Sequence, residues 1–374
     1  QYKCEKLYDR YITNSDIKPI LKELSKTYKV SEIGKSVKNQ SIYAIEIGTG
    51  KKRILMWSQM HGNESTTTKA IFDLLDTLQN DAFKYILKEC SFYIIPILNP
   101  DGARSYTRLN ANNKDLNRDA QNLSQPESLV LKKAFDSFKP NYCFNLHGQR
   151  TIFSAGSTNN PATVSFLSPA QDDVRSITQT RKIAMELIVK INETLQKFIP
   201  NQIGRYDDSF NINCVGDTFQ NLNVPTVLFE AGHYKEDYER EKTREYIYVA
   251  LLTGLDYLAS NEVTGNFYND YLKIPENKKL FFDIIIRNCR LSKDDNSSIN
   301  DIGILYKEEL CNKKVVFIPN IEKISNLKDF YGHKELNANN HVVSTATGEL
   351  IEEGLAIDFV LIKNELFALN AIKN

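Results

Sequence analysis

The chain has 374 residues, and 47 lysines and arginines balance 47 aspartates and glutamates, so the formal net charge is zero. A balanced charge without a long basic run argues against nucleic acid or an anionic membrane as a partner. The longest apolar stretches, such as 93–98, are far shorter than the ~20 residues that a membrane-spanning helix needs. We therefore expect a soluble protein with no nucleic-acid and no membrane partner.

The cysteines and the sequence around residue 63 bear on the cellular compartment. Six cysteines are scattered along the chain without a CxxC pair, which is typical of reduced thiols rather than of a disulfide framework. Asn63-Glu64-Ser65 fits a glycosylation acceptor, and a glycan there would block the candidate site described below. The chain opens with Gln1 and charged residues instead of an apolar signal segment. We expect a cytoplasmic protein whose export signal is absent or has been removed.

The pattern of apolar residues predicts strands that alternate with helices over the first 260 residues. In chain order we expect a helix at 15–26, strands at 41–48 and 53–59, a helix at 66–77, a strand at 92–97, a helix at 125–138, a strand at 142–146, a helix at 174–198, a strand at 226–229 and a helix at 238–259. Such alternation predicts an α/β domain, with a mixed, mostly parallel central sheet flanked by helices.

The composition changes near residue 260. Residues 260–266 are polar and contain a glycine, which is typical of a linker, and β-branched segments follow at 283–286, 314–318 and 357–362. We therefore predict two domains, a large one over 1–265 and a small β-rich one over 270–374.

Polar residues that can carry chemistry stand at or just after the ends of predicted strands. They are His61, Asn99, His147 and Glu230. Open α/β sheets bind their ligands in a crevice at the carboxyl ends of the strands. We expect these four side chains to face one crevice.

His61 and Glu64 form an HxxE pair directly after an apolar strand, so an imidazole and a carboxylate can converge on one ion across a tight turn. Zinc in hydrolytic enzymes commonly takes two histidines and one glutamate and leaves a fourth position for water. His147 is the candidate for the third ligand, because it is the other histidine among the five that ends a predicted strand. Taken alone, each histidine is more readily interpreted as a structural or surface residue than as a ligand.

A polar segment follows the predicted strand at 92–97. It contains Asn99-Pro100-Asp101-Gly102 and then the stretch 108–118, with Arg108 and Arg118 at its ends. Forked guanidinium groups suit the binding of an anion such as a carboxylate. The alternative interpretation is a solvated loop without a ligand.

These motifs, in this order, resemble the zinc metallocarboxypeptidase family. The shared order is HxxE, then NPDG, then R-x-N-x-N-x-x-D-L-N-R, then a strand ending in His and a strand ending in Glu, over about residues 50–235. The resemblance implies a carboxypeptidase-like fold with its catalytic domain over 1–265. It also implies that His61, Glu64 and His147 hold one zinc ion and that Arg108 polarises the substrate carbonyl. By the same resemblance, Asn117 and Arg118 dock a terminal carboxylate and Glu230 is the general base.

The chain departs from the family pattern at two places. Asn113 stands where the family often has glycine, and asparagine also tolerates a left-handed backbone. Tyr206 is the residue placed to match the mobile tyrosine that caps the substrate in the family, although Asp207, Asp208 and Ser209 after it match no family pattern. The resemblance places the side-chain pocket at about 213–219, including Asp217, and leaves the preferred substrate open.

The leading hypothesis is a zinc-dependent hydrolase that removes a C-terminal residue from peptides. An amidase or deacylase that acts on N-acyl amino acids or cell-wall peptides is the alternative, because such enzymes resemble the same HGNE site and share the preference for a free carboxylate. A non-enzymatic binding protein is disfavoured, because no ligand, arginine or base is missing. A GxSxG nucleophile motif is absent from the sequence. His333 and His341 are interpreted as surface residues of the second domain.

Overall fold

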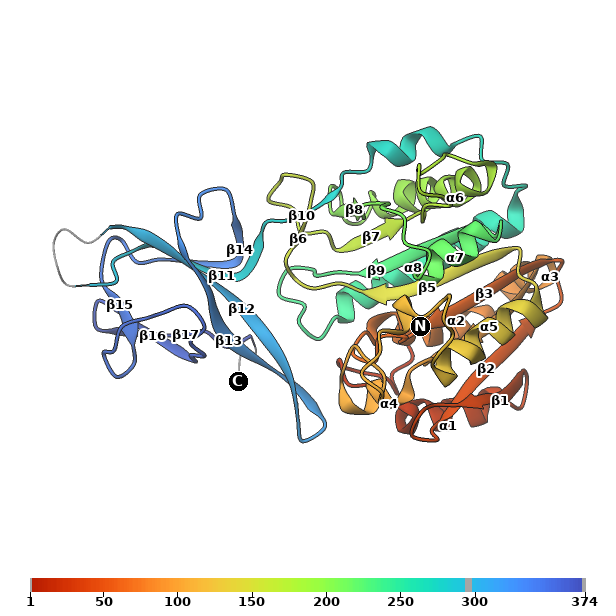
Figure 1. Ribbon diagram of the computed structural model, residues 1–374, viewed down its shortest axis with the longest axis horizontal. Coiled ribbons are helices and arrows are strands. Elements are labelled where there is room, and N and C mark those ends of the chain that lie inside the picture. Colours follow the sequence, from red (N-terminus) through yellow and green to blue (C-terminus); the bar gives the residue numbers. More distant parts are fainter. Residues whose placement is uncertain (1, 293–297, 372–374) are drawn as a thin grey trace.

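A computed structural model describes residues 2–292 and 298–371 of the chain. Figure 1 shows an α/β part, coloured red to cyan, beside a smaller part in blue that consists of strands. This arrangement confirms the predicted fold class, an α/β domain followed by a β-rich C-terminal region. Among the described residues, no helix is long and apolar enough to cross a membrane.

The α/β part is built on one mixed sheet of eight strands, in the order β1-β2-β4-β3-β5-β9-β7-β8. The central strands β4, β3, β5 and β9 are parallel to one another, whereas β1, β2 and β7 join the sheet by antiparallel pairing. The strands span β1 (Lys29–Lys35), β2 (Ser41–Gly48), β3 (Lys52–Ser58), β4 (Cys90–Ile95), β5 (Tyr142–Gly148), β7 (Val164–Leu167), β8 (Ile203–Arg205) and β9 (Thr226–Ala231).

Helices cover both faces of this sheet, because successive side chains of its central strands point to opposite sides and are apolar on both. In β3, Ile54 and Met56 pack on one face, and Leu55 and Trp57 pack on the other. The first face carries α1 (Asn14–Leu24), α2 (Thr66–Leu78), α3 (Lys84–Glu89), α6 (Gln179–Leu195) and α8 (Glu241–Ser260), and the second carries α5 (Pro126–Phe138) and α7 (Val215–Asn221).

Local capping sets where helices begin. The side chain of Thr13 accepts a hydrogen bond from the backbone of Ser15, and that of Asp16 accepts from the backbone of Thr13. This capping box makes Thr13 the N-cap of α1, so the helix begins at Asn14, one residue before the expected start at 15. Pro19 lies within the helix. Short turns of helix occur at η1 (Asp81–Phe83), α4 (Pro100–Ser105), η2 (Leu116–Arg118) and η3 (Tyr268–Lys273).

The C-terminal part has its own apolar core between two small sheets. Its four-stranded sheet has the order β13-β12-β11-β14, and a three-stranded sheet has the order β15-β16-β17. The strands span β11 (Phe281–Cys289), β12 (Asn300–Cys311), β13 (Lys314–Ser325), β14 (Tyr331–Asn337), β15 (Val343–Thr345), β16 (Phe359–Ile362) and β17 (Glu365–Ala368). Where the two domains divide stays a prediction.

The two parts are joined by strand pairing and by buried polar contacts. β10 (Asn277–Lys279) pairs with β6 (Phe153–Ala155) of the α/β part. The ring of His333 contacts the rings of His233 and Phe281, and its Nε2 lies 2.8 Å from the carbonyl oxygen of Thr151. The expectation that His333 is a surface residue is therefore wrong, because it packs between the two parts.

A buried ion pair fixes the N-terminal segment to α2 and α8. Arg244 donates to both carboxylate oxygens of Asp73, at 2.7 and 2.6 Å, and also to the carbonyl oxygens of Leu7 and Cys4. The Arg244 and Asp73 side chains are only 1% and 5% exposed. The pair thus stabilises the segment that precedes α1.

Replacing Arg244 tests how much this pair contributes. Arg244→Ala leaves the Asp73 carboxylate buried without its partner, so we expect the free energy of unfolding to fall by about 3–5 kcal/mol. Urea denaturation measures the change. Lys242→Ala, on the exposed side of the same helix, is the control and should change the value by less than about 0.5 kcal/mol. An Arg244→Ala change as small as that of the control would contradict the assignment.

Candidate metal centre and catalytic cleft

His61, Glu64 and His147 meet at the carboxyl edge of the sheet. The Nδ1 atoms of the two histidines are 3.1 Å apart, and each lies near a different Glu64 oxygen, at 3.0 Å for His61 and 3.1 Å for His147. One ligand atom from each residue lies within 4.8 Å of the other two. Two imidazole nitrogens and a carboxylate that face one point form a typical zinc-binding set. The residues present therefore fit a zinc ion.

Asp115 orients one of these histidines. Its Oδ1 lies 3.0 Å from Nε2 of His61, on the ring edge opposite to the atom that faces Glu64. A carboxylate that accepts from the far nitrogen of a ligating histidine fixes the tautomer and the ring direction. Sequence reasoning assigned no role to Asp115, although it is the Asp of the Asp-Leu-Asn-Arg motif. Asn113, in the same loop, has a φ of 56°, the left-handed conformation expected there.

The charges of the site shift several pKa values. Burial lowers the pKa of His147, and Glu64 only partly opposes this effect. Burial alone would raise the pKa of Glu64, but the two histidines outweigh it and lower that pKa. A neutral imidazole and an ionised carboxylate are the forms that bind a metal ion, so the shifts of His147 and Glu64 favour binding. Burial lowers the pKa of His61, but Glu64 and Asp115 outweigh this effect and raise it.

Glu230 lies beside this group and is not one of its three ligands. In the parallel pairing of β5 with β9, Glu230 is directly opposite His147. Its Oε2 is buried and has no hydrogen-bond partner among the described residues. Burial, and then the negative charge of Glu64, raise the pKa of Glu230 well above its usual value, while Arg108 and Arg240 oppose the shift. A carboxylate with a raised pKa is a better proton acceptor than an exposed one.

The three site residues predicted in the polar segment 99–118 are Arg108, Asn117 and Arg118, and they lie around the same metal-binding group. Arg108 donates through Nε and Nη2 to Asp115, both at 3.1 Å, and through Nη1 to Glu64 at 3.3 Å. Arg118 donates to the carbonyl oxygen of Asn117, and the amide oxygen of Asn117 accepts from the backbone of Val215. The guanidinium groups are partly exposed, so both can reach a ligand.

Tyr206 follows β8 and reaches the same cleft. Its ring contacts Phe153 edge-on, with ring centres 5.5 Å apart. Burial, followed by the nearby charge of Glu230, raises the pKa of Tyr206. The structure therefore brings Tyr206 close to the candidate base, although whether this tyrosine caps a substrate stays a prediction.

The predicted metal-binding, catalytic and substrate-binding residues line one cleft with a volume of about 630 Å³. This volume falls in the usual range of about 300–1,000 Å³ for small-ligand sites. Residues from both parts of the chain line it, and they are Arg10, His61, Asn63, Glu64, Thr66, Arg108, Asn117, Arg118, His147, Gly148, Gln149, Arg150, Thr151, Phe153, Tyr206, Glu230, Tyr238, Arg240, Asp283, Tyr306, Lys307, Glu308 and Phe317. Asn99, which was expected to face the same crevice, is instead buried, and its side chain caps α4 by accepting from the backbone of Gly102.

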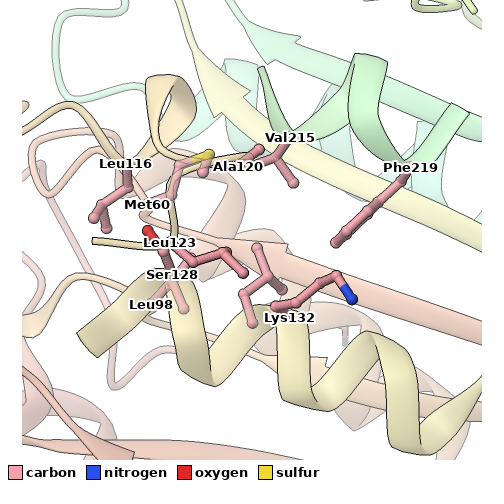
Figure 2. Close-up of a pocket in the computed structure, with 10 residues that line it drawn as sticks. Met60, Leu98, Leu116, Ala120, Leu123, Ser128, Lys132, Val215 and Phe219 are labelled. Atoms are coloured by element: carbon pink, nitrogen blue, oxygen red, sulfur yellow. The ribbon is translucent and has the colours of Figure 1, made fainter. Parts of the chain in front are cut away.

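Figure 2 shows a second, smaller pocket, which is lined by Met60, Leu116 and Val215 among others. Its volume is about 10 Å³, which is about the space of one water molecule. Val215 and Phe219 of α7 line this pocket. Asp217 of the same helix is buried, and burial raises its pKa to about 6. The small pocket is a packing feature rather than a ligand site.

Arg240 holds the ends of the two strands that carry His147 and Glu230. Its Nη1 donates to the carbonyl oxygen of Ala231 at 2.7 Å, and its Nη2 donates to that of Gln149 at 2.9 Å. Ala231 directly follows Glu230, and Gln149 lies two residues after His147. Sequence reasoning missed Arg240, because a single arginine at the start of a helix carries no motif.

One family of known proteins matches this chain. The model of the zinc carboxypeptidase family matches residues 13–213, which is more than half of the chain. The chain belongs to the zinc carboxypeptidase family. The match contains His61, Glu64 and His147 and ends before Glu230. The prediction that Glu230 is the general base therefore rests on its register opposite His147 and on its buried Oε2 atom.

Curated relatives match over part of their length. Carboxypeptidase SOL1 of Arabidopsis thaliana is 29% identical over 163 residues, which cover 37% of this chain and 33% of that protein. Carboxypeptidase 2 of Trichophyton rubrum is 31% identical over 114 residues, which cover 30% of this chain and 20% of that protein. The chain thus spans a third or less of the length of these two relatives.

Solved structures share the fold. Carboxypeptidase A from Helicoverpa armigera superposes with a TM-score of 0.51 at 17% identity, over 67% of this chain and 74% of that one. Bovine thrombin-activatable fibrinolysis inhibitor gives 0.51 at 13% identity, over 69% of this chain and 99% of that one. These likenesses confirm the carboxypeptidase-like fold, and the family match confirms the resemblance drawn from the sequence. The roles of the individual site residues stay predictions.

Removing one ligand tests the metal site. His147→Ala leaves two of the three side chains, so we expect zinc content per chain, measured by atomic emission after dialysis, to fall to less than about a tenth. His341→Ala, in the C-terminal part, is the control and should keep its zinc. Zinc content near the wild-type value in His147→Ala would overturn the assignment.

Proposed function

We propose that this protein is a zinc-dependent hydrolase that removes a C-terminal residue from peptides. The observation that carries the proposal is the buried, unpartnered carboxylate oxygen of Glu230, in register with the candidate ligand His147. Family membership supports the reaction class, because the matching family is that of the zinc carboxypeptidases.

His61, Glu64 and His147 would hold one zinc ion. When bound, zinc acts as a Lewis acid and lowers the pKa of water to about 7. Asp115 keeps the His61 ring directed at the site, and the backbone N–H of Gly148 donates to Oε2 of Glu64 at 2.9 Å. These contacts hold the ligand atoms in place before an ion arrives.

Glu230 would accept the proton of the attacking water and pass it to the leaving amine. Its raised pKa suits both steps, because a group that accepts a proton readily must also donate it within one turnover. The buried Oε2 atom is kept from bulk water, which strengthens its interactions with the reacting groups.

Four side chains would position the substrate. Asn117 and Arg118 would bind the terminal carboxylate, for which the forked guanidinium is suited. Arg108 would turn from Asp115 toward the scissile carbonyl and stabilise the charge that develops on its oxygen. Tyr206 would cover the substrate from the side of β8.

A zinc-dependent amidase or deacylase is the alternative, acting on N-acyl amino acids or cell-wall peptides. The same carboxylate-binding pair and the same base serve that reaction, so the two functions differ only in the acyl part of the substrate. A screen of zinc-loaded protein against peptides and N-acyl amino acids with identical C-terminal residues separates them. Faster turnover of the N-acyl amino acids would favour the alternative.

Glu230→Gln separates catalysis from binding. The amide cannot accept the proton, so we expect kcat to fall by about 100 to 10,000-fold, with KM and zinc content little changed. Steady-state kinetics and metal analysis measure the three quantities. Glu236→Gln, an exposed residue after the same strand, is the matched control. A variant that keeps more than about a tenth of wild-type kcat would show that Glu230 is not the base.

Arg118 tests the need for a free carboxylate. Arg118→Ala loses a charged hydrogen-bond donor, so we expect kcat/KM for free-acid peptides to fall by about 10 to 100-fold. For the wild type, amidated peptides should be poor substrates by a similar factor. Arg104→Ala, which lies outside the cleft lining, should keep wild-type kinetics. Equal rates on free-acid and amidated peptides would contradict the docking role.

A further inference from the structure

The catalytic cleft is not formed by the α/β part alone. Five of its lining residues belong to strands of the C-terminal part, namely Asp283, Tyr306, Lys307, Glu308 and Phe317. Four of them come from β12 and β13, which pair along their length as a hairpin. In Figure 1 this hairpin extends from the blue part toward α4. The hairpin therefore forms one wall of the space that holds the metal ligands.

Glu308 fastens this wall to the catalytic part. Nη2 of Arg10 donates to both carboxylate oxygens of Glu308, each at 2.9 Å, and the hydroxyl of Tyr106 donates to one of them at 2.6 Å. Tyr106 precedes Arg108 by two residues, and the carbonyl oxygen of Arg10 accepts from Ser65, next to Glu64. The hairpin is thus bonded to the segments that carry two predicted site residues.

A second set of contacts lies at the base of the hairpin. The hydroxyl of Tyr238 donates to Asp283 at 2.9 Å, and the backbone of Tyr306 donates to the same carboxylate at 2.8 Å. The ring of Tyr238 also contacts the rings of Tyr306 and Phe317, with centres 5.1 and 5.3 Å apart. The wall is therefore held in a single position by polar and aromatic contacts.

The wall lies across the cleft from the proposed carboxylate-docking pair. Asn117 and Arg118 belong to η2, whose Leu116 packs in the layer of α5 and α7. The hairpin is bonded to Arg10 and Tyr238, which shortly precede α1 and α8 in the chain, and these two helices pack in the opposite layer. The metal ligands lie at the sheet edge between the two layers. A peptide that docks its carboxylate at Arg118 must extend its acyl part toward the hairpin.

The surface that the hairpin offers to this acyl part combines the Phe317 ring with Lys307, whose side chain is exposed and pairs with Glu309. Glu308 and Asp283 are already satisfied by the donors named above. The hydroxyl of Tyr306 donates to the carbonyl oxygen of Leu369. Phe317, opposite Glu308 in the hairpin register, is partly buried and has the guanidinium of Arg10 5.9 Å from its ring centre. Its ring is the part of the wall that a substrate chain meets.

We propose that the β12–β13 hairpin closes the acyl side of the cleft and that Phe317 determines how many residues a substrate can carry before the scissile bond. This inference rests on the proposed hydrolysis at a free C-terminus. The cleft volume of about 630 Å³ suits a ligand of small-molecule size, so short peptides or single acylated residues are the substrate class. Residues further from the scissile bond meet the Phe317 ring instead of solvent.

The test uses peptides that share their last two residues and differ in the number of residues before them. For the wild type we expect kcat/KM for an N-acetylated dipeptide to exceed that for a decapeptide by about tenfold or more. Phe317→Ala should open the wall and reduce this ratio by about tenfold, and Phe317→Trp should increase it. Zinc content and circular dichroism check that each variant is folded and loaded.

Val316→Ala is the matched control, because its side chain lies on the neighbouring position of the same strand and outside the cleft lining. It should keep the wild-type ratio. Equal kcat/KM for short and long peptides in the wild type would overturn the role of the wall and leave the proposed hydrolysis intact. Failure of the wild type to cleave any free-acid substrate would overturn both proposals. If Phe317→Ala does not fold, the wild-type ratio and Phe317→Trp decide.

Discussion

The parallel register of β3, β5 and β9 is the constraint on which the site depends. It places Ser58 opposite Leu146 and His147 opposite Glu230, so the ends of three neighbouring strands meet at one edge. A shift of one residue would turn every side chain of a strand to the other face. Since β5 is apolar and buried on both faces, core packing holds its position along the strand direction. The geometry of the candidate metal site is thus a consequence of the core.

Electrostatics explains why this edge suits a cation. Glu64, Asp115 and Glu230 bring three carboxylates to a space that the histidines share, and two of the three lie close enough that Glu64 raises the pKa of Glu230. Neighbouring carboxyl groups in a buried space cannot all ionise without raising the pKa of at least one of them. A divalent cation reverses the sign of that interaction, since it attracts the same carboxylates. A bound ion and Glu230, the proposed base, would therefore be linked by charge as well as by position.

Much of the α/β part could be predicted because its signals are local. The strands at β3, β4, β5 and β9 are apolar runs with β-branched or aromatic residues, and the site motifs follow their ends. α6 begins at Gln179 rather than at 174, because Thr178 is its N-cap and accepts from the backbone of Arg181. Periodicity alone does not identify that cap in a stretch that contains several polar residues.

The contacts between distant segments could not be predicted. β12 was not recognised as a strand, because Lys307, Glu308 and Glu309 interrupt its apolar pattern. The sequence around Glu308 is typical of an exposed acid, but in the structure Glu308 pairs with Arg10, which is 298 positions away. Arg240 likewise has acceptors that only the folded chain brings together. Residues whose role comes from such pairing leave no local pattern.

The same pairing brings the C-terminal part to the cleft, because Glu308 of β12 pairs with Arg10. Arg10 and Arg240 are both buried beside the cleft, and their positive charges repel each other. Burial, and then Arg10, lower the pKa of Arg240 to about 10, whereas Glu308 raises it. Two buried guanidinium groups need a nearby acid, because uncompensated charge is costly in a low-dielectric space.

Glu308 supplies part of that compensation from the second domain. Arg240 is the residue that holds the ends of β5 and β9, so the acid that stabilises its charge also supports the spacing of His147 and Glu230. A sequence pattern divides the chain into a catalytic domain and an appended one. The charge balance around Arg240 involves both parts, since Glu308 of β12 and Asp237 of the α/β part each raise the pKa of this arginine.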